Sequence, residues 1–301
     1  MSREFTNLIF SWRIIVIIGV LYMERIGIVI KPDSSIALSI ARRVVKVLLE
    51  NSIMPLIEDG SSRSYPTLSN YGTFTLDNPP KKIIVIGGDG TLLRTIMFLG
   101  DPDSIIMTVR AGKRGFLLDV EPYEVEERVV DFIRDNYRLT RYSRLKVKAP
   151  DRQEYCVLND AVFITKMAKL VSLSININGE RAMNLDGDGV IVSTTAGSTA
   201  YSLSAGGPIV DPGLDVIIIT PLNPVQLHLR PLVIRFDSRI EVDISQSSNS
   251  LHLVLDGQIS LDLLPGDIVT LEHCPYPAII ARFKWWENYY EKLYSRIYSY
   301  L

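Results

Sequence analysis

The sequence predicts an N-terminal α/β domain (a parallel sheet with flanking helices) followed by a mostly antiparallel, all-β C-terminal domain. In the first half, apolar strand patterns at 26–30, 83–86 and 105–109 alternate with helical patterns, which is typical of a parallel sheet covered on both faces. After about Tyr142, short β-rich runs separated by turn residues take over, as in antiparallel sheets. At 301 residues the chain is long enough for each part to have its own core.

The domain boundaries follow from this change of pattern. We expect residues 23–142 to form the α/β domain, together with an aromatic tail helix that returns to it within 278–301. Residues 143–277 are expected to form the β-rich domain. Residues 1–22 are interpreted as a doubtful N-terminal extension, because a new strand opens directly after Met23, which we expect to be the natural start. The alternative is a genuine extra strand or anchor, although the apolar run at 14–22 is too short to span a bilayer.

The first half contains helical segments with recognisable limits. Apolar residues recur at helical spacing in 36–51, and a second run at 92–99 stops at a Gly-Asp-Pro turn. A third helix is expected over 122–136. Residues 55–58 are expected to form a short strand, whereas 60–80, with three prolines and many Ser, Asn and Gly, predict a loop or mobile flap.

The second half is predicted to consist almost entirely of short strands. Turns such as Asn178-Gly179 and Asp256-Gly257 separate many of them, and only 196–205 has room for a helix. The expected strands are 145–149, 161–165, 173–177, 189–193, 216–219, 232–236, 240–244, 251–255 and 267–271.

Composition excludes several classes of protein. A net charge of −2 without basic clusters predicts no nucleic-acid partner, and no apolar run is long enough for a membrane span. Cys156 and Cys274 lie far apart and outside any Cys-x-x-Cys pair, so neither a disulfide nor a thiolate metal site is expected, which fits a reducing cytoplasm. His228, His252 and His273 show no zinc-ligand spacing.

One stretch indicates a phosphate-binding loop. Gly87-Gly88-Asp89-Gly90-Thr91 follows the buried strand 83–86 and precedes the helix at 92–99. Glycines let a backbone approach an anion, and free N–H groups at a helix N-terminus point towards it. A carboxylate beside phosphates is unfavourable, so Asp89 is a candidate for binding a cation or accepting a hydroxyl proton. The alternative is that Asp89 only caps the helix.

A second stretch combines small residues, hydroxyls and acids. Asp186 and Asp188 precede the strand 189–193, and the small and hydroxyl residues of 194–208 follow it. The two carboxylates could accept hydrogen bonds from a ribose diol, and the small residues allow close approach to a ligand. A tight turn followed by a packing helix would explain the same composition.

Together these motifs resemble the NAD kinase family. The glycine motif is shared with diacylglycerol and sphingosine kinases and, in related form, with phosphofructokinases. The run Asp188-Gly189-Val190-Ile191-Val192-Ser193-Thr194, with Gly197-Ser198-Thr199-Ala200-Tyr201-Ser202 after it, is close to diagnostic of NAD kinases. Asn159-Asp160, Arg230-Pro231-Leu232, Asp256-Gly257-Gln258 and Tyr276-Pro277-Ala278 also match the order found in archaeal and bacterial members.

The resemblance implies a transferase that phosphorylates the 2′-hydroxyl of the adenosine ribose of NAD, giving NADP, in a site between the two domains. Asp89 would be the catalytic base. The donor phosphates of ATP or polyphosphate would lie on Gly87, Gly88, Gly90, Thr91 and Arg94. NAD would contact Asp89, Gly90, Arg94, Asn159, Asp160, Asp186, Asp188, Thr199, Ala200, Tyr201, Ser202, Ser204 and Gln258.

Further expectations follow from the same resemblance. Mg²⁺ or another divalent cation would be held mainly through the donor phosphates, with no metal site made chiefly by the protein. The protein would be a cytoplasmic homodimer or homotetramer. Two other readings remain at this point: a catalytically silent NAD-binding regulator, and a lipid or sugar kinase that shares only the glycine motif. The chain departs from the family at Val225-Gln226, where a His-Ser pair is usual.

Overall fold

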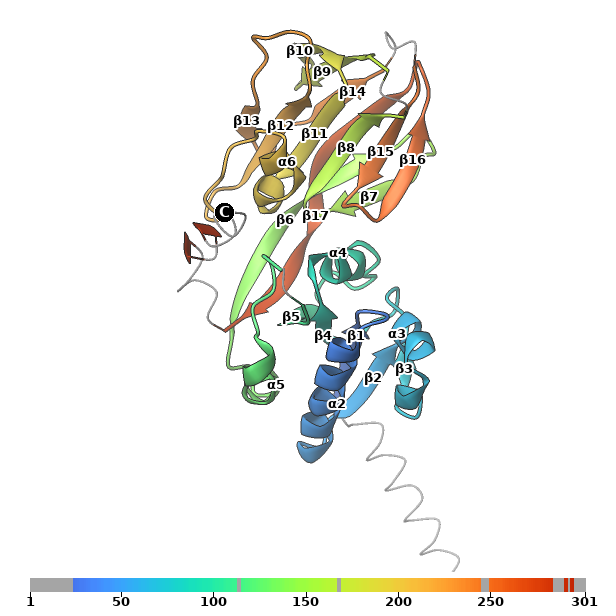
Figure 1. The fold of residues 1–301 in the computed structure, drawn as a ribbon, viewed down its shortest axis with the longest axis vertical. Helices are drawn as coiled ribbons and strands as arrows, with labels where there is room; N and C mark the ends of the chain where they lie inside the picture. The colour runs from blue at the N-terminus through green and yellow to red at the C-terminus, as the bar shows by residue number, and fades with distance from the viewer. Residues whose placement is uncertain are drawn as a thin grey trace, which may run out of the picture. The chain divides into compact units, whose positions relative to one another are not determined.

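The computed structural model describes residues 24–112, 115–166, 169–244, 249–283, 290–291 and 293–294 (Figure 1). The chain divides into two compact units, which are described separately below. Unit 1 comprises Met1–Thr91, Asp103–Arg138 and Ala281–Leu301, and unit 2 comprises Leu92–Pro102 and Leu139–Ile280. The predicted fold class is confirmed, because unit 1 is α/β with a parallel sheet and unit 2 is mostly antiparallel β.

The sheet of unit 1 is parallel, with the strand order β5-β4-β1-β2-β3. Its central strands are apolar and almost completely buried, as expected when both faces are covered. The strands are β1 (Arg25–Ile30), β2 (Met54–Glu58), β3 (Thr73–Phe74), β4 (Lys82–Gly87) and β5 (Ile105–Arg110).

Helix α2 (Ser35–Glu50) covers one face of this sheet. The Ser34 hydroxyl accepts a hydrogen bond from the Ala37 N–H at 3.2 Å and caps the helix. The buried side of α2 packs on Ile26, Ile28 and Ile30 of β1.

Other elements of unit 1 differ from the predictions. Residues 60–80, predicted as a loop, contain α3 (Asp59–Ser64), the 3₁₀ turn Pro66–Leu68 and strand β3. The Glu58 carboxylate caps α3 by accepting from the Ser61 N–H at 2.7 Å, a local hydrogen bond that hydrophobic periodicity does not reveal. Helix α4 (Asp89–Met97) begins earlier than predicted, and the expected helix at 122–136 consists of a 3₁₀ turn (Pro122–Glu124) and α5 (Val125–Ile133).

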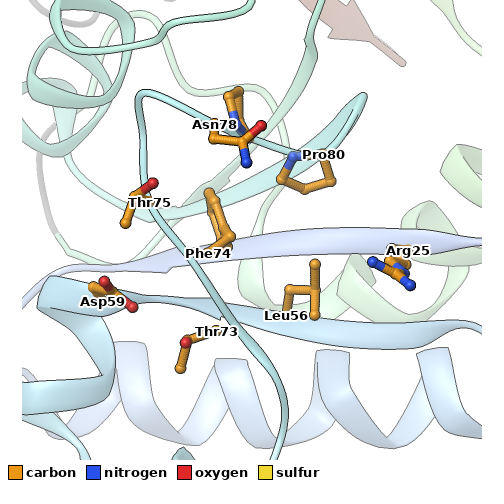
Figure 2. Close-up of a pocket in the computed structure, with 9 residues that line it drawn as sticks. Arg25, Leu56, Asp59, Thr73, Phe74, Thr75, Asn78 and Pro80 are labelled. Carbon is orange, nitrogen blue, oxygen red and sulfur yellow. The ribbon is translucent and has the colours of Figure 1, made fainter.

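A pocket of about 400 Å³ lies on the face of the sheet opposite α2 (Figure 2). Gly27 marks this face, since a Cβ atom there would lie 2.8 Å from the side chains of Phe74 and Pro80. None of the residues predicted to bind NAD or donor phosphates lines the pocket. Its lining residues are Arg25, Leu56, Asp59, Thr73, Phe74, Thr75, Asn78, Pro79 and Pro80.

Unit 2 has two sheets whose inner faces share one core. One sheet has the order β10-β9-β14-β17, and β6 pairs with β17 and β7; the other has the order β13-β12-β11-β8-β15-β16. The first group is β6 (Arg138–Lys148), β7 (Glu154–Val157), β9 (Val171–Ile177), β10 (Glu180–Gly187), β14 (Ile240–Asp243) and β17 (Ile268–Arg282). The second is β8 (Asp160–Thr165), β11 (Gly189–Thr194), β12 (Val216–Leu222), β13 (Leu232–Arg235), β15 (Leu251–Leu255) and β16 (Ile259–Leu263).

Two of these strands are much longer than predicted. Strand β6 begins at Arg138 rather than 145, because the polar residues at its start give no strand pattern. Strand β17 continues through Pro275 and Pro277 to Arg282, although prolines normally indicate a strand end.

A disulfide joins Cys156 of β7 to Cys274 of β17, with the Cα atoms 6.1 Å apart. The expectation of no disulfide was therefore wrong. Although 118 residues separate the two cysteines in sequence, β6 pairs with both of their strands and brings them together. Sequence spacing alone carries no information about this pairing.

Three further predictions concern helical segments. The region 196–205 holds a 3₁₀ turn, Ala196–Thr199, and the one-turn helix α6 (Tyr201–Ser204). Of the expected tail helix, 290–291 and 293–294 are helical, whereas Trp285, Trp286 and Tyr289 lie outside the described residues, as does the extension 1–22. Within the described part of the chain, no helix is long and apolar enough to cross a membrane.

Candidate active site

The glycine motif lies at the carboxyl end of β4, as the sequence predicts. Strand β4 ends at Gly87 and α4 begins at Asp89, so only Gly88 separates the two elements. A Cβ atom on Gly87 would lie 2.4 Å from the Thr91 hydroxyl oxygen, which explains why this position must be glycine. At Gly90, by contrast, a Cβ atom would meet nothing within 4 Å. Packing within unit 1 therefore does not require glycine at this second position.

The Asp89 carboxylate accepts hydrogen bonds from the segment that follows β5. Its Oδ2 accepts a hydrogen bond from the Phe116 N–H at 2.9 Å, and its Oδ1 accepts from the Leu117 N–H at 3.0 Å. These bonds go to the segment after β5 and not to the first turn of α4, so they differ from those of a helix cap. Two backbone donors fix the carboxylate plane while leaving lone pairs on both oxygens.

Two basic residues flank the glycine loop at the same edge of the sheet. The Lys31 N–H, directly after β1, donates to the carbonyl oxygen of Ile86 at 2.8 Å, and the Lys31 side chain is exposed. On the other side, Arg110 is paired with Gly87 in the β4–β5 register. The Arg110 guanidinium makes an ion pair with Glu121, and its Nε donates to the Glu121 carboxylate oxygen Oε2 at 3.0 Å. Neither Lys31 nor Arg110 belongs to a sequence motif that marks it as a binding residue.

In unit 2, Asn159 and Asp160 lie at the start of β8, and both are more than 90% buried. The side chain of Asp256 holds their backbone: its Oδ1 accepts from the Asn159 N–H at 2.7 Å and from the Asp160 N–H at 3.0 Å. The Asn159 side-chain oxygen is buried without a hydrogen-bond partner among the described residues. An unsatisfied buried acceptor is costly unless a ligand completes it.

The electrostatics of this region are unusual. Burial, and secondarily the nearby negative charge of Asp256, raises the pKa of Asp160 to about 7. Burial lowers the pKa of the Arg144 guanidinium to about 10, against an opposing effect of Asp256. Two carboxylates and one guanidinium are thus enclosed together in unit 2.

The segment 194–202 adjoins Asn159. The Thr194 N–H donates to the Asn159 carbonyl oxygen at 2.9 Å, and the Thr194 hydroxyl donates to the Leu158 carbonyl oxygen at 2.6 Å. A Cβ atom on Gly197 would lie 2.1 Å from the Asn159 carbonyl oxygen, so this close approach requires glycine. Ser202 is fully buried and bonds to Thr220 Oγ1 at 2.9 Å. The remaining residues named in this segment differ in exposure: Thr199 is buried, Ala200 half-buried, and Tyr201 and Ser204 exposed.

Gln258 also belongs to this part of unit 2. It follows the Asp256-Gly257 turn, and its side-chain amide donates to the Asp256 carbonyl oxygen at 3.2 Å. The structure therefore brings Asn159, Asp160, Gln258 and the segment 194–202 together, where β8 begins and where its neighbours β11 and β15 end.

Asp186 and Asp188 lie elsewhere in unit 2. Asp188 precedes β11, whereas Thr194 ends it, and six residues of strand span about 20 Å. One ligand could touch both ends only in an extended conformation. The Asp186 carboxylate accepts from the Ser172 hydroxyl at 2.5 Å and from the Gln226 amide at 2.8 Å, and Asp188 accepts from Asn223 at 2.7 Å. Gln226, a departure from the family pattern, thus supports Asp186.

No group of three or more His, Cys, Asp and Glu residues in the described parts of the chain is arranged to hold a metal ion.

Two models of known protein families match this chain, one for each of the two units. The family model for the ATP-NAD kinase N-terminal domain matches residues 26–137, and that for the ATP-NAD kinase C-terminal domain matches residues 158–283. An NAD kinase of Aeropyrum pernix is 49% identical over 277 residues, covering 91% of this chain and 98% of the relative. An NAD kinase of Methanothermobacter thermautotrophicus is 33% identical over 276 residues, covering 91% and 96%.

Solved structures show the same fold. The crystal structure of an NAD kinase from Archaeoglobus fulgidus in complex with ATP is 27% identical, with a TM-score of 0.74, and the match covers 90% of this chain and 99% of that one. Yeast NADH kinase complexed with NADH has a TM-score of 0.81 at 24% identity, covering 90% and 87%, and shows likeness of fold.

Fold and sequence therefore define a kinase, built from an α/β unit with a glycine-rich loop and a β unit. The chain belongs to the NAD kinase family, and the relatives support NAD kinase activity; no finding favours a lipid or sugar kinase or a silent regulator.

Proposed function

We propose that this protein transfers a phosphoryl group from ATP or polyphosphate to the 2′-hydroxyl of the adenosine ribose of NAD, giving NADP. The observation that carries the proposal is the placement of Asp89: its carboxylate is fixed by the N–H groups of Phe116 and Leu117 at the end of β4, within a glycine loop. In open parallel sheets ligands bind at this end of the strands.

The donor phosphates would occupy the glycine loop. Gly90 is exposed and has no neighbour that a Cβ atom would touch, so its lack of a side chain serves a ligand better than it serves packing. Backbone N–H groups at the start of α4 would then face the anion. Thr91 and Arg94 lie on the same helix, and Lys31 would add a positive charge from the adjacent strand end. The ATP complex of the Archaeoglobus fulgidus relative supports ATP as one donor.

The acceptor NAD would be bound by unit 2. The Asn159 side-chain oxygen, which has no hydrogen-bond partner among the described residues, and the buried Asp160 carboxyl offer polar groups for the ribose or the adenine base. The segment 199–202, Ser204 and Gln258 would line the dinucleotide, and Asp186 and Asp188 would meet only a distant part of it.

Asp89 would act mainly by orientation. A carboxylate is too weak a base to ionise a ribose hydroxyl in advance, so it would take the proton late, as the new O–P bond forms. The O–P bond to the leaving phosphate would break at the same stage. Mg²⁺ or another divalent cation would be held through the donor phosphates and would neutralise their charge.

The test is NADP formation from NAD and Mg²⁺, with ATP and with polyphosphate in parallel arms, and with NADH as a second acceptor. We expect Asp89→Asn to lower kcat by about 10²–10⁴-fold while NAD binding, measured by calorimetry, is retained. Asp59→Asn is the matched control, because Asp59 also begins a helix directly after a parallel strand of unit 1. This control should keep full activity.

Three outcomes distinguish the readings. Product that is lost only in Asp89→Asn supports the proposal and identifies the donor. NAD binding without product from either donor would instead favour a regulator. Equal loss in both variants would show that a carboxylate at the start of a helix is needed for folding and not for chemistry. The proposed homodimer or homotetramer is measured by light scattering, and the proposed cytoplasmic location by cell fractionation.

A further inference from the structure

Asp256 is a buried carboxylate to which the proposed reaction assigns no role. It follows β15, is 4% exposed and has a positive φ of 48°. Its Oδ2 accepts from the Leu158 N–H at 2.7 Å, and its Oδ1 accepts from the N–H groups of Asn159 and Asp160. Its own N–H donates to the Asp160 carbonyl oxygen at 3.0 Å. One side chain therefore fixes three consecutive backbone donors.

The charge of Asp256 is balanced from a different strand. Arg144 of β6 is 7% exposed and interacts electrostatically with Asp256, and its Nη2 donates to the carbonyl oxygen of Cys156. Burial raises the pKa of Asp256, whereas three backbone hydrogen bonds and this guanidinium act in the opposite direction and favour its ionised form. An ionised acceptor makes hydrogen bonds about twice as strong as a neutral one.

The segment that Asp256 holds is fixed on its other side as well. Thr194 bonds to the carbonyl oxygens of Leu158 and Asn159, and Gly197 packs directly against Asn159. The backbone of 158–160 is thus clamped between the end of β15 and the end of β11. Its two polar side chains, Asn159 and Asp160, are what this clamp orients.

We propose that Asp256 is a positioning residue for the acceptor substrate: its carboxylate holds the backbone of 158–160 so that Asn159 and Asp160 are oriented to bind NAD. The inference rests on the proposed function, since it assumes that these two side chains contact the dinucleotide. Asp256 itself makes no contact with the substrate. Its loss should weaken NAD binding without affecting donor binding.

The test is Asp256→Asn, with Asp262→Asn as the matched control. Asn tolerates a positive φ, so the substitution does not strain the turn, but its amide removes the charge and places a donor against backbone N–H groups. Asp262 is a carboxylate on the adjacent strand β16 that pairs with Lys166 and His252 at the surface. We expect Asp256→Asn to raise KM for NAD at least tenfold and to leave KM for the donor within twofold, with no change for Asp262→Asn.

A second readout separates positioning from simple loss of stability. Removing the charge of Asp256 lowers the pKa of Asp160, so the limb of the kcat/KM profile that reports Asp160 should move to lower pH. Arg144 is the other charged group of this cluster and is unchanged in the variant. A variant with a lower melting temperature, but with wild-type KM for NAD and the same pH profile, would overturn the proposal.

Hydrogen exchange keeps the test independent of activity. The peptide containing 158–160 should exchange faster in Asp256→Asn than in wild type, and unchanged exchange would overturn the proposal. Wild type that forms no NADP would count against the proposed function alone, since this exchange comparison still tests the clamp. If Asp256→Asn does not fold, Arg144→Gln offers a second test, because it removes the positive charge beside Asp256. This variant should raise KM for NAD by about three- to tenfold. An unchanged KM for NAD would contradict the inference.

Discussion

Removing the Cys156–Cys274 disulfide should destabilise the protein more than any single surface substitution. The bond closes a loop over a sequence separation of 118 residues. In the chain-entropy relation, a loop of this length lowers the entropy of the unfolded chain by about 16 cal/mol/K, or about 5 kcal/mol at 25 °C. Compared with a typical net stability of about 5–15 kcal/mol, this is a large fraction.

The assay is guanidinium unfolding followed by far-UV circular dichroism, with and without reductant. We expect the midpoint of wild type to fall sharply on reduction, and the double variant Cys156→Ala/Cys274→Ala to match reduced wild type and not to respond to reductant. Unfolded, non-reduced wild type should show no titratable thiol. A difference below about 1 kcal/mol between oxidised and reduced protein would refute the reasoning, because the closed loop would then not constrain the unfolded chain.

Further predictions concern single side chains. Lys31→Ala should raise KM for the donor about tenfold in steady-state kinetics while KM for NAD stays constant, since Lys31 lies beside the glycine loop; equal changes in both would contradict this placement. Burial raises the pKa of Asp160 from 3.8 to about 7, so the folded protein binds this proton more tightly than the unfolded chain does. The contribution of Asp160 to the free energy of unfolding therefore falls as the pH rises from about 4 to 7. Asp160→Asn should therefore raise the melting temperature more at pH 8 than at pH 5, and an equal gain at both would show that the carboxyl is not perturbed. Gly197→Ala should cost about 1–3 kcal/mol in thermal unfolding, because its Cβ atom would collide with the Asn159 carbonyl, whereas Gly90→Ala should leave the melting temperature unchanged and raise KM for the donor; matched losses of stability would contradict the packing.

Local patterns predicted the fold class and the glycine loop well. Strand β4 is an unbroken apolar run, and the glycines after it indicate a tight turn into the next helix. The placement of Asp89 at the end of a parallel strand follows from the same run. Here the secondary structure and the proposed catalytic residue are encoded within a dozen consecutive residues.

Other features could not be read from the sequence because they depend on residues far apart in the chain. The disulfide needs β7 and β17 to be neighbours of β6, and the role of Asp256 needs β15 to pair with β8. Asp186 and Asp188 were grouped with Thr199–Ser202 because they are close in sequence, although a full strand separates them. Helix α3, in a segment predicted to be a loop, is held by a distant residue, since the Ser61 hydroxyl accepts from the Ile30 N–H at 2.8 Å.

The split composition of unit 1 has a consequence for synthesis of the chain. Its last segment begins at Ala281, after the whole of Leu139–Ile280. The Arg282 guanidinium donates to the Leu117 carbonyl oxygen at 2.8 Å and the Phe283 N–H to Asp119 at 2.7 Å, so these bonds can form only after the segment 139–280 has been synthesised. At about 5–20 residues per second, the ribosome takes on the order of ten seconds to make the intervening segment. During that interval the α/β unit is incomplete while the β unit can already fold, so a nascent chain stalled before residue 281 should carry a protease-resistant β unit and a protease-sensitive N-terminal portion.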